Sequence, residues 1–121
     1  MNLTGPVAQQ IRAELNRVAH DDGPGAEQAR IALGDGPLTH RLKAAIQALA
    51  EHRGANSSTC PSDAARAVGG ESWRDLMTDA RDLARELAQS GVVEITQRGV
   101  VLDPHGDWRG PIRIRTGRRR E

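Results

Sequence analysis

Apolar residues recur every three or four positions along much of the chain, which is the spacing that places them on one face of an α-helix. This spacing predicts helices over residues 6–20, 26–33, 38–53, 61–69 and 72–90. In the last of these helices, Trp73 begins the apolar stripe and Leu87 ends it. Ser72 is expected to cap this helix, with Asp75 three residues later as the acidic partner of a capping box.

A different pattern, rich in β-branched residues, begins after Gly91 and predicts three short strands. The strands are expected over residues 92–97, 100–102 and 112–115. Arg98 and Gly99 read as a tight turn, so the first two strands are expected to pair as a hairpin. The third strand alternates isoleucine with arginine, which makes one of its faces apolar and the other basic.

The predicted elements follow one another in the order of a winged helix-turn-helix: helix, short helix, tight turn, long helix and hairpin. The expected fold class is therefore mostly α with a small β-hairpin or sheet, preceded by an N-terminal helical arm. We expect an arm and linker over residues 1–36, a winged-helix domain over 37–116 and a basic C-terminal tail over 117–121. Three roles are open for the arm: packing on the domain, pairing with a second copy as a homodimer, or gripping a partner.

Several short runs of sequence stand out between Leu38 and Arg115. They are Cys60-Pro61-Ser62-Asp63 followed by Ala65-Arg66, Trp73-Arg74 with Leu76-Met77, Ile95-Thr96-Gln97-Arg98-Gly99, Asp103-Pro104, and Arg109-Gly110-Pro111-Ile112-Arg113. In these runs the chain resembles a family of small bacterial domains of unknown function that has a winged-helix pattern. The resemblance implies a fold class and no activity, and the arm lies outside it.

Charge is divided unevenly along the chain, although the formal net charge is only +1. Residues 1–97 hold 10 basic and 13 acidic side chains, whereas residues 98–121 hold 7 basic and 3 acidic ones. A basic end of this kind either attracts a polyanion such as nucleic acid or is a solvated tail, and composition leaves both interpretations open.

Little in the sequence points to catalysis, to a cofactor or to a metal. The single cysteine, Cys60, cannot form an internal disulfide, and the four histidines lack the close pairs typical of metal ligands. Cys60 is expected to be a small buried residue in a helix cap position, and a redox-sensing thiol is the alternative. No apolar run is long enough to span a membrane and no signal peptide is evident, so a cytoplasmic protein without enzymatic activity is expected.

The predicted long helix supplies one group of candidates for a nucleic-acid interface. Arg74, Thr78, Arg81 and Arg85 form one line on it, and Asp75, Asp79, Asp82 and Glu86 form a second line about 100° away. A recognition helix directs such a basic line to the major groove or to phosphates. The acidic line repels phosphates, so an ordinary solvated helix is the alternative interpretation.

The predicted hairpin and the last strand supply the second group. It consists of Arg98, Arg109, Arg113 and Arg115, whose planar guanidinium groups suit phosphate oxygens. A solubilising sheet face is the alternative for these arginines. Trp108, beside them in sequence, is expected either to pack over the end of the sheet or to stack on a base or a partner.

The leading hypothesis is a DNA-binding winged-helix protein with a regulatory role. The alternatives are a protein-interaction module that uses the winged helix and the arm, and an RNA- or ribosome-binding domain that uses the same basic hairpin. The DNA hypothesis depends on one geometric condition, namely that the arginines of the long helix and those of the hairpin face a common side.

Overall fold

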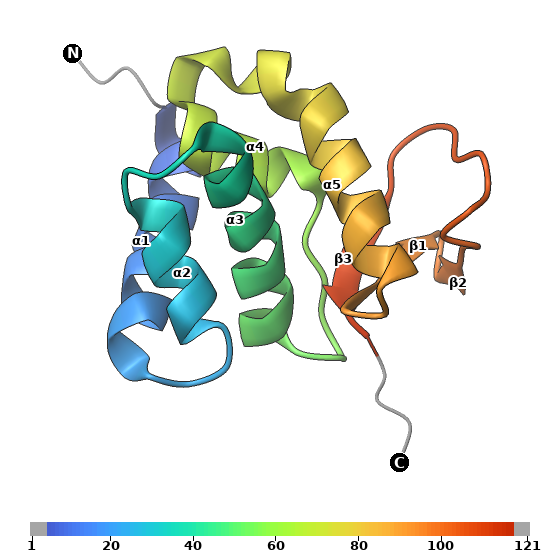
Figure 1. Ribbon diagram of the computed structural model, residues 1–121, viewed down its shortest axis with the longest axis horizontal. Helices are drawn as coiled ribbons and strands as arrows, with labels where there is room; N and C mark the ends of the chain where they lie inside the picture. The colour runs from blue at the N-terminus through green and yellow to red at the C-terminus, as the bar shows by residue number, and fades with distance from the viewer. Residues whose placement is uncertain (1–4, 118–121) are drawn as a thin grey trace.

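Helices account for most of the computed structural model, which describes residues 5–117, and a small antiparallel sheet lies at one side of them (Figure 1). This architecture confirms the expected fold class as a helix-rich domain with a small sheet. In chain order the elements are α1 (Gly5–Asp21), α2 (Ala26–Leu33), α3 (Leu38–Arg53), α4 (Pro61–Gly69), the 3-10 helix η1 (Gly70–Leu76), α5 (Met77–Gln89), β1 (Val93–Gln97), β2 (Val100–Val101) and β3 (Arg113–Thr116). The predicted basic tail falls mostly outside the described residues.

The arm, made of α1 and α2, packs against the helices that follow it. Leu15 and Val18 of α1 are buried in one hydrophobic cluster with residues of α3 and α4. The turn before α2 approaches α3 closely, because a Cβ added at Gly25 would lie 2.8 Å from the carbonyl oxygen of Ala48. Glycine is therefore needed at this position, and packing on the domain is the arrangement that the arm adopts in the monomer.

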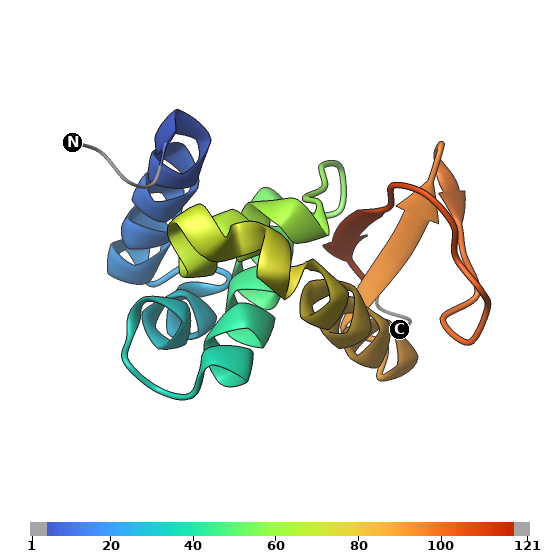
Figure 2. The same ribbon diagram turned by 90° about the horizontal axis from the view of Figure 1, so that it is seen from above.

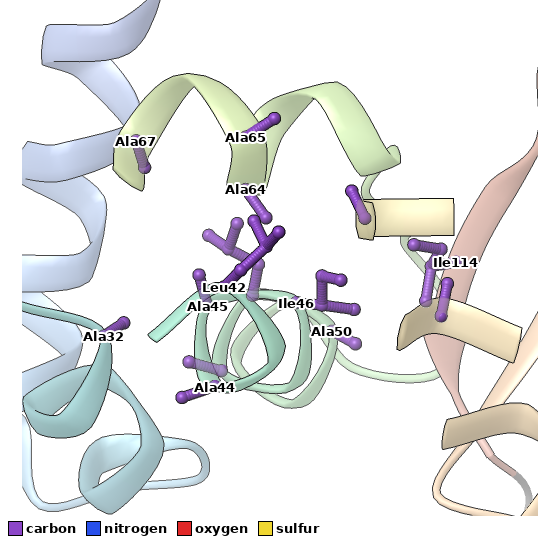
Figure 3. Packing of buried hydrophobic residues seen from close by; sticks show 14 of the residues in the cluster. Ala32, Leu42, Ala44, Ala45, Ile46, Ala50, Ala64, Ala65, Ala67 and Ile114 are labelled. Carbon is purple, nitrogen blue, oxygen red and sulfur yellow. The ribbon is translucent and has the colours of Figure 1, made fainter. Parts of the chain in front are cut away.

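Alanine and branched aliphatic residues fill the core, since the chain contains neither Phe nor Tyr. α3 runs through the middle of the body, and its residues Leu42, Ile46 and Leu49 are fully buried. Alanines on the facing sides of α3 and α4, among them Ala45 and Ala64, leave room for the two helices to pack closely (Figure 3). The predicted bounds of this central helix are confirmed.

The helix predicted over residues 72–90 begins later than expected, so this part of the prediction is wrong. Residues 70–76 form the 3-10 helix η1, and the α-helix begins only at Met77. Ser72 has φ −92° and ψ 17°, so it lies inside η1 and does not cap an α-helix. The reason is local packing: Leu76 turns back onto Gly69, where an added Cβ would lie 2.7 Å from a Leu76 methyl group.

The sheet has the strand order β2-β1-β3, with both neighbouring pairs antiparallel, and it stands beside α5 (Figure 2). The three predicted strands are all found, each shifted or shortened by one residue at an end. Arg98 and Gly99 join β1 to β2 with φ of 54° and 82°, the left-handed backbone of a two-residue hairpin turn.

The two faces of the sheet differ as the alternation in the last strand predicts. Ile95 on β1 pairs with Ile114 on β3, and both are buried toward the helices. Thr96 pairs with Arg113, and Glu94 pairs with Arg115, so these side chains share the opposite face. The basic face of the sheet therefore turns away from the core.

Candidate nucleic-acid interface

Two of the predicted site residues on α5, Arg81 and Arg85, bind the loop that connects β2 to β3. Arg81 donates a hydrogen bond to the carbonyl oxygen of Gly110 at 3.0 Å. Arg85 donates to the carbonyl oxygens of Pro104 and Gly106 at 2.8 and 2.7 Å. Because this loop has few backbone partners of its own, these guanidinium groups satisfy carbonyls that would otherwise depend on water.

Trp108 completes the attachment of the β2–β3 loop to α5. The guanidinium carbon of Arg85 lies 3.9 Å from the centre of the Trp108 ring, a cation–π contact. The Trp108 indole nitrogen donates to the carbonyl oxygen of Asp103 at 2.9 Å, and Arg81 donates to the carbonyl oxygen of Trp108 at 3.3 Å. Trp108 is partly buried against the hydrophobic cluster, and its contacts are with α5 and its own loop.

The exposed surface of α5 is consequently more acidic than the sequence pattern suggests. Arg81 and Arg85 are only partly exposed, whereas the acidic line on η1 and α5 is open to solvent. That line consists of Asp75, Asp79, Asp82 and Glu86. Thr78 is exposed beside it, and Arg74 is exposed with its guanidinium carbon 4.6 Å from the Trp73 ring centre. The expected basic strip does not form along this helix.

The hairpin arginines form a different arrangement, because three of them line one open concavity. Arg98 reaches it from the β1–β2 turn, Arg109 from the β2–β3 loop and Arg113 from β3. The concavity measures about 500 Å³ and its remaining lining comes from Gln97 and residues 110–112. The Gln97 side-chain amide donates to the carbonyl oxygens of Arg109 and Pro111 at 2.5 and 3.0 Å, which fixes the loop against β1.

A second concavity of about 430 Å³ shares Arg113 with the first. Its other lining residues are 55–58, Thr96, Gly99 and Arg115. Arg113 donates to the hydroxyl and the carbonyl oxygen of Ser58 at 2.8 and 3.1 Å. Arg115 donates to the Glu94 carboxylate at 2.9 Å, so its charge is largely neutralised. We call the two adjoining concavities the hairpin groove.

The hairpin groove is electropositive. Among the described residues that line it, none carries a carboxylate, while four are arginines. Asp107 lies 3.6 Å from Arg109, but these side chains are 83% and 89% exposed, and an ion pair this open to water is weak. Arg98 and Arg109 therefore remain available to an anionic ligand, and Arg113, whose hydrogen bonds to Ser58 are to neutral oxygens, keeps its positive charge beside them.

The groove also contains residues that the sequence pattern did not single out. The sequence pattern places Gln97 in a predicted strand, and it leaves Asn56, Ser57 and Ser58 between the helices predicted over residues 38–53 and 61–69. A polar run directly before the Cys60-Pro61 helix start was the available signal, because it places hydrogen-bonding groups next to a sheet edge. In the structure that edge is formed by Thr59, which bridges to Ile114.

A second charged cluster is structural, because it ties the arm to α3 and α4. Arg53 donates to both carboxylate oxygens of Glu14, at 2.7 and 3.0 Å, and to Asp63 at 3.2 Å. Asp63 also accepts hydrogen bonds from the Thr59 hydroxyl at 2.7 Å and from the Cys60 backbone N–H at 3.3 Å. These contacts bury charge between elements that are distant in the sequence.

This cluster shifts two pKa values. The hydrogen bond to Glu14 is the largest influence on Arg53 and raises its pKa. For Asp63 burial is the largest single influence and acts to raise the pKa, but the hydrogen bonds from Thr59 and Cys60, with the charge of Arg53, together lower the pKa below its ordinary value of 3.8. Both shifts favour the charged forms, as expected for a structural ion pair.

Metal ligation finds no support in the described part of the chain, where no three His, Cys, Asp or Glu residues gather closely enough to hold an ion. Cys60 is a free cysteine at the start of α4, with its sulfur 3.0 Å from the Ser62 hydroxyl. None of the helices in residues 5–117 combines the length and apolarity needed to cross a membrane.

The fold and the groove define a small helical domain with a basic surface at its β-hairpin. The chain belongs to DUF3253, a family of proteins of unknown function, whose family model matches residues 39–117. The match confirms the resemblance to a family of domains of unknown function, and the matched residues include every residue of the hairpin groove. α1 and α2 precede the matched residues. No curated protein is significantly similar to the chain.

Proposed function

We propose that this protein is a non-catalytic DNA-binding protein that holds the phosphate backbone in the hairpin groove. The observation that supports this proposal is the convergence of Arg98, Arg109 and Arg113 on one open concavity without a lining carboxylate. Guanidinium groups bind phosphates through paired, charge-assisted hydrogen bonds. Three such groups in one concavity suit a chain of phosphates better than they suit a solubilising surface.

In this role α3, α4 and α5 with the β1–β2 hairpin form a winged helix. The hairpin is the wing, and it contacts the DNA in place of α5. The open carboxylates of α5 repel phosphates, so this helix stays at a distance from the DNA and the hairpin approaches it. Docking through α5, the last helix of the winged helix, would instead bring Asp79 and Asp82 toward the DNA backbone. A cytoplasmic location, where the lone thiol of Cys60 stays reduced, fits this role.

Salt dependence of binding tests the proposal. In a fluorescence anisotropy titration with a labelled random duplex, the association constant should fall by about 0.9 log units per log unit of salt for each phosphate that is neutralised. The slope of the logarithm of the association constant against the logarithm of the salt concentration should equal about three such increments, one for each contact by Arg98, Arg109 and Arg113. No binding to duplex, single strand or structured RNA at low salt would reject the nucleic-acid function altogether.

A protein-interaction module is the second candidate, and two features favour it. Val100 and Val101 on the edge strand β2 are 63% and 51% exposed, and an exposed edge strand can pair with another chain. The acidic surface of α5 adds a second face that suits a basic protein. Light scattering of the full chain tests self-association, because deleting the arm would expose buried residues of α3 and α4 that share a hydrophobic cluster with Leu15 and Val18, and would confuse unfolding with dissociation.

A further inference from the structure

We infer that the ligand of the hairpin groove is double-stranded DNA, recognised through its backbone without selection for base sequence. This inference rests on the proposed function and adds to it the form of the nucleic acid and the way in which it is recognised. It follows from three features of the molecule: the state of its aromatic rings, the surface of α5 and the distribution of cations along the groove.

The positions of the aromatic rings argue against a single-stranded ligand. Proteins that hold single-stranded nucleic acid stack successive bases on exposed aromatic side chains, each worth about 1–3 kcal/mol. This chain has only two aromatic residues, Trp73 and Trp108. Neither is among the residues that line the groove. A single strand in the groove would therefore bind through its phosphates alone.

Both rings are, in addition, occupied by arginines of the same chain. The guanidinium carbons of Arg66 and Arg74 lie 4.3 and 4.6 Å from the ring centre of Trp73, and that of Arg85 lies 3.9 Å from the ring centre of Trp108. A base that stacked on the occupied face of either ring would first have to displace a guanidinium group, at the cost of the cation–π contact and, for Arg85, of two hydrogen bonds to carbonyls.

The surface of α5 argues against recognition of the base sequence. Direct reading of sequence needs side chains that reach base edges in the major groove, commonly from a helix. On α5 the arginines are turned to the β2–β3 loop, and carboxylates and Thr78 face the solvent. Carboxylates on this surface would lie against the flanking phosphates of any duplex that admitted the helix to its major groove. Base reading by this helix is thus disfavoured.

The distribution of cations in the groove favours a duplex as the ligand. Arg113 lies where the two concavities meet, with Arg98 and Arg109 in one concavity and the serines of residues 57–58 in the other. Free cations therefore lie on one side of Arg113, and hydrogen-bonding hydroxyl groups lie on the other. A duplex presents one phosphate charge about every 1.7 Å along its axis, twice the linear density of one strand, so a surface that recognises only phosphates favours the duplex.

Competition among four ligands tests the inference with the full-length protein. The ligands are a 20-base-pair DNA duplex, one of its strands alone, a duplex of the same composition in permuted order, and the RNA duplex of the first sequence. We expect the two DNA duplexes to bind with equal affinity within about twofold, and the single strand to bind at least about tenfold more weakly, the loss expected for about one phosphate contact near 0.1 M salt.

The outcomes separate this inference from the function on which it rests. A single strand that binds as tightly as the DNA duplex, or one DNA sequence preferred more than tenfold over its permutation, would overturn the inference while leaving nucleic-acid binding intact. An RNA duplex that binds as tightly as the DNA duplex would overturn the choice of DNA in the proposed function. Binding to none of the four ligands would overturn the proposed function instead. Tryptophan fluorescence gives a second measurement, because a base stacked on either ring would quench it, and no quenching is expected.

Discussion

Arginine side chains are used differently in the helical body, residues 5–89, and in the hairpin region, residues 93–117. In the helical body Arg12 and Arg41 donate to backbone carbonyls at 2.7 and 3.0 Å, and Arg53 pairs with carboxylates. In the hairpin region Arg98 is exposed at a turn, and the side chain of Arg109 is 89% exposed. The same residue type therefore stabilises one region and forms the candidate ligand site in the other.

The difference between the regions lies in the supply of acceptors. Helix ends and irregular loops leave carbonyl oxygens without backbone partners, and an arginine within reach of them is drawn into the fold. The tip of a two-residue hairpin offers few such acceptors, and within residues 5–117 Arg98 makes no side-chain hydrogen bond or ion pair. Counting arginines along a chain thus says less about a binding surface than locating the carbonyls that compete for them.

Removal of the hairpin arginines should have the largest effect of any change considered. We expect the triple variant Arg98→Asn, Arg109→Gln, Arg113→Gln to lose about tenfold in DNA affinity per contact near 0.1 M salt, on the order of 10³-fold in total. Asparagine suits residue 98 because it tolerates the φ of 54° found there. Anisotropy titrations at several salt concentrations would measure both the affinity and the slope.

A control with the same loss of charge sharpens this comparison of regions. The variant Arg17→Gln, Arg30→Gln, Arg74→Gln removes three exposed arginines of the helical body. Its net charge changes as much as that of the hairpin variant, and its salt slope should stay that of the wild type. An equal loss of affinity in both variants would mean that net charge, and not the groove, attracts the DNA.

Loss of the Arg53 ion pairs should be the largest effect on stability. The variant Arg53→Met leaves Glu14 and Asp63, whose side chains are only 16% and 17% exposed, without their cation. Breaking a fully buried pair costs about 3–5 kcal/mol, so for this partly accessible cluster we expect about 2 kcal/mol less free energy of unfolding. Urea denaturation measures the change, and the double variant Arg53→Met, Glu14→Gln should recover part of it.

Elements with a strong repeating pattern were predictable from the sequence. The bounds of α3 follow from its apolar face and from Gly54 after its end, and the alternation of Ile112, Arg113, Ile114 and Arg115 gives the two faces of β3. These predictions succeed because the pattern and the burial that it causes lie within a single element.

Features that depend on contacts between different elements were not predictable. The late start of α5 depends on Leu76 meeting Gly69, and the fate of Arg85 depends on the carbonyls of Pro104 and Gly106, about twenty residues away. The spacing of the arginines on α5 is the same whether they face solvent or a loop. For the same reason the grouping of Arg98 with Arg109 required the structure.

A smaller effect is expected from Arg85, which would position the groove without touching the ligand. The variant Arg85→Gln loses the Trp108 contact and the bonds that hold the β2–β3 loop, so Arg109 becomes less well placed. We expect a several-fold loss of affinity with an unchanged salt slope, because no phosphate contact is removed. Faster amide hydrogen exchange in residues 103–111 should accompany it. A slope reduced by about 0.9 would instead identify Arg85 as a phosphate ligand.

The smallest expected effect is a change in stability at low pH that depends on Asp63. The pKa of Asp63 lies below 3.8 in the folded protein, so its charged form contributes stability at neutral pH. That contribution is present above the unfolded pKa and is lost as pH falls through the lower folded value, which places the loss below about pH 4. Asp63→Asn should therefore be less stable than the wild type at pH 7, and the two should converge toward pH 3. A difference that stayed constant between pH 7 and pH 3 would show that the Asp63 carboxylate contributes through shape and hydrogen bonding alone, and that the charge of Arg53 is balanced by Glu14.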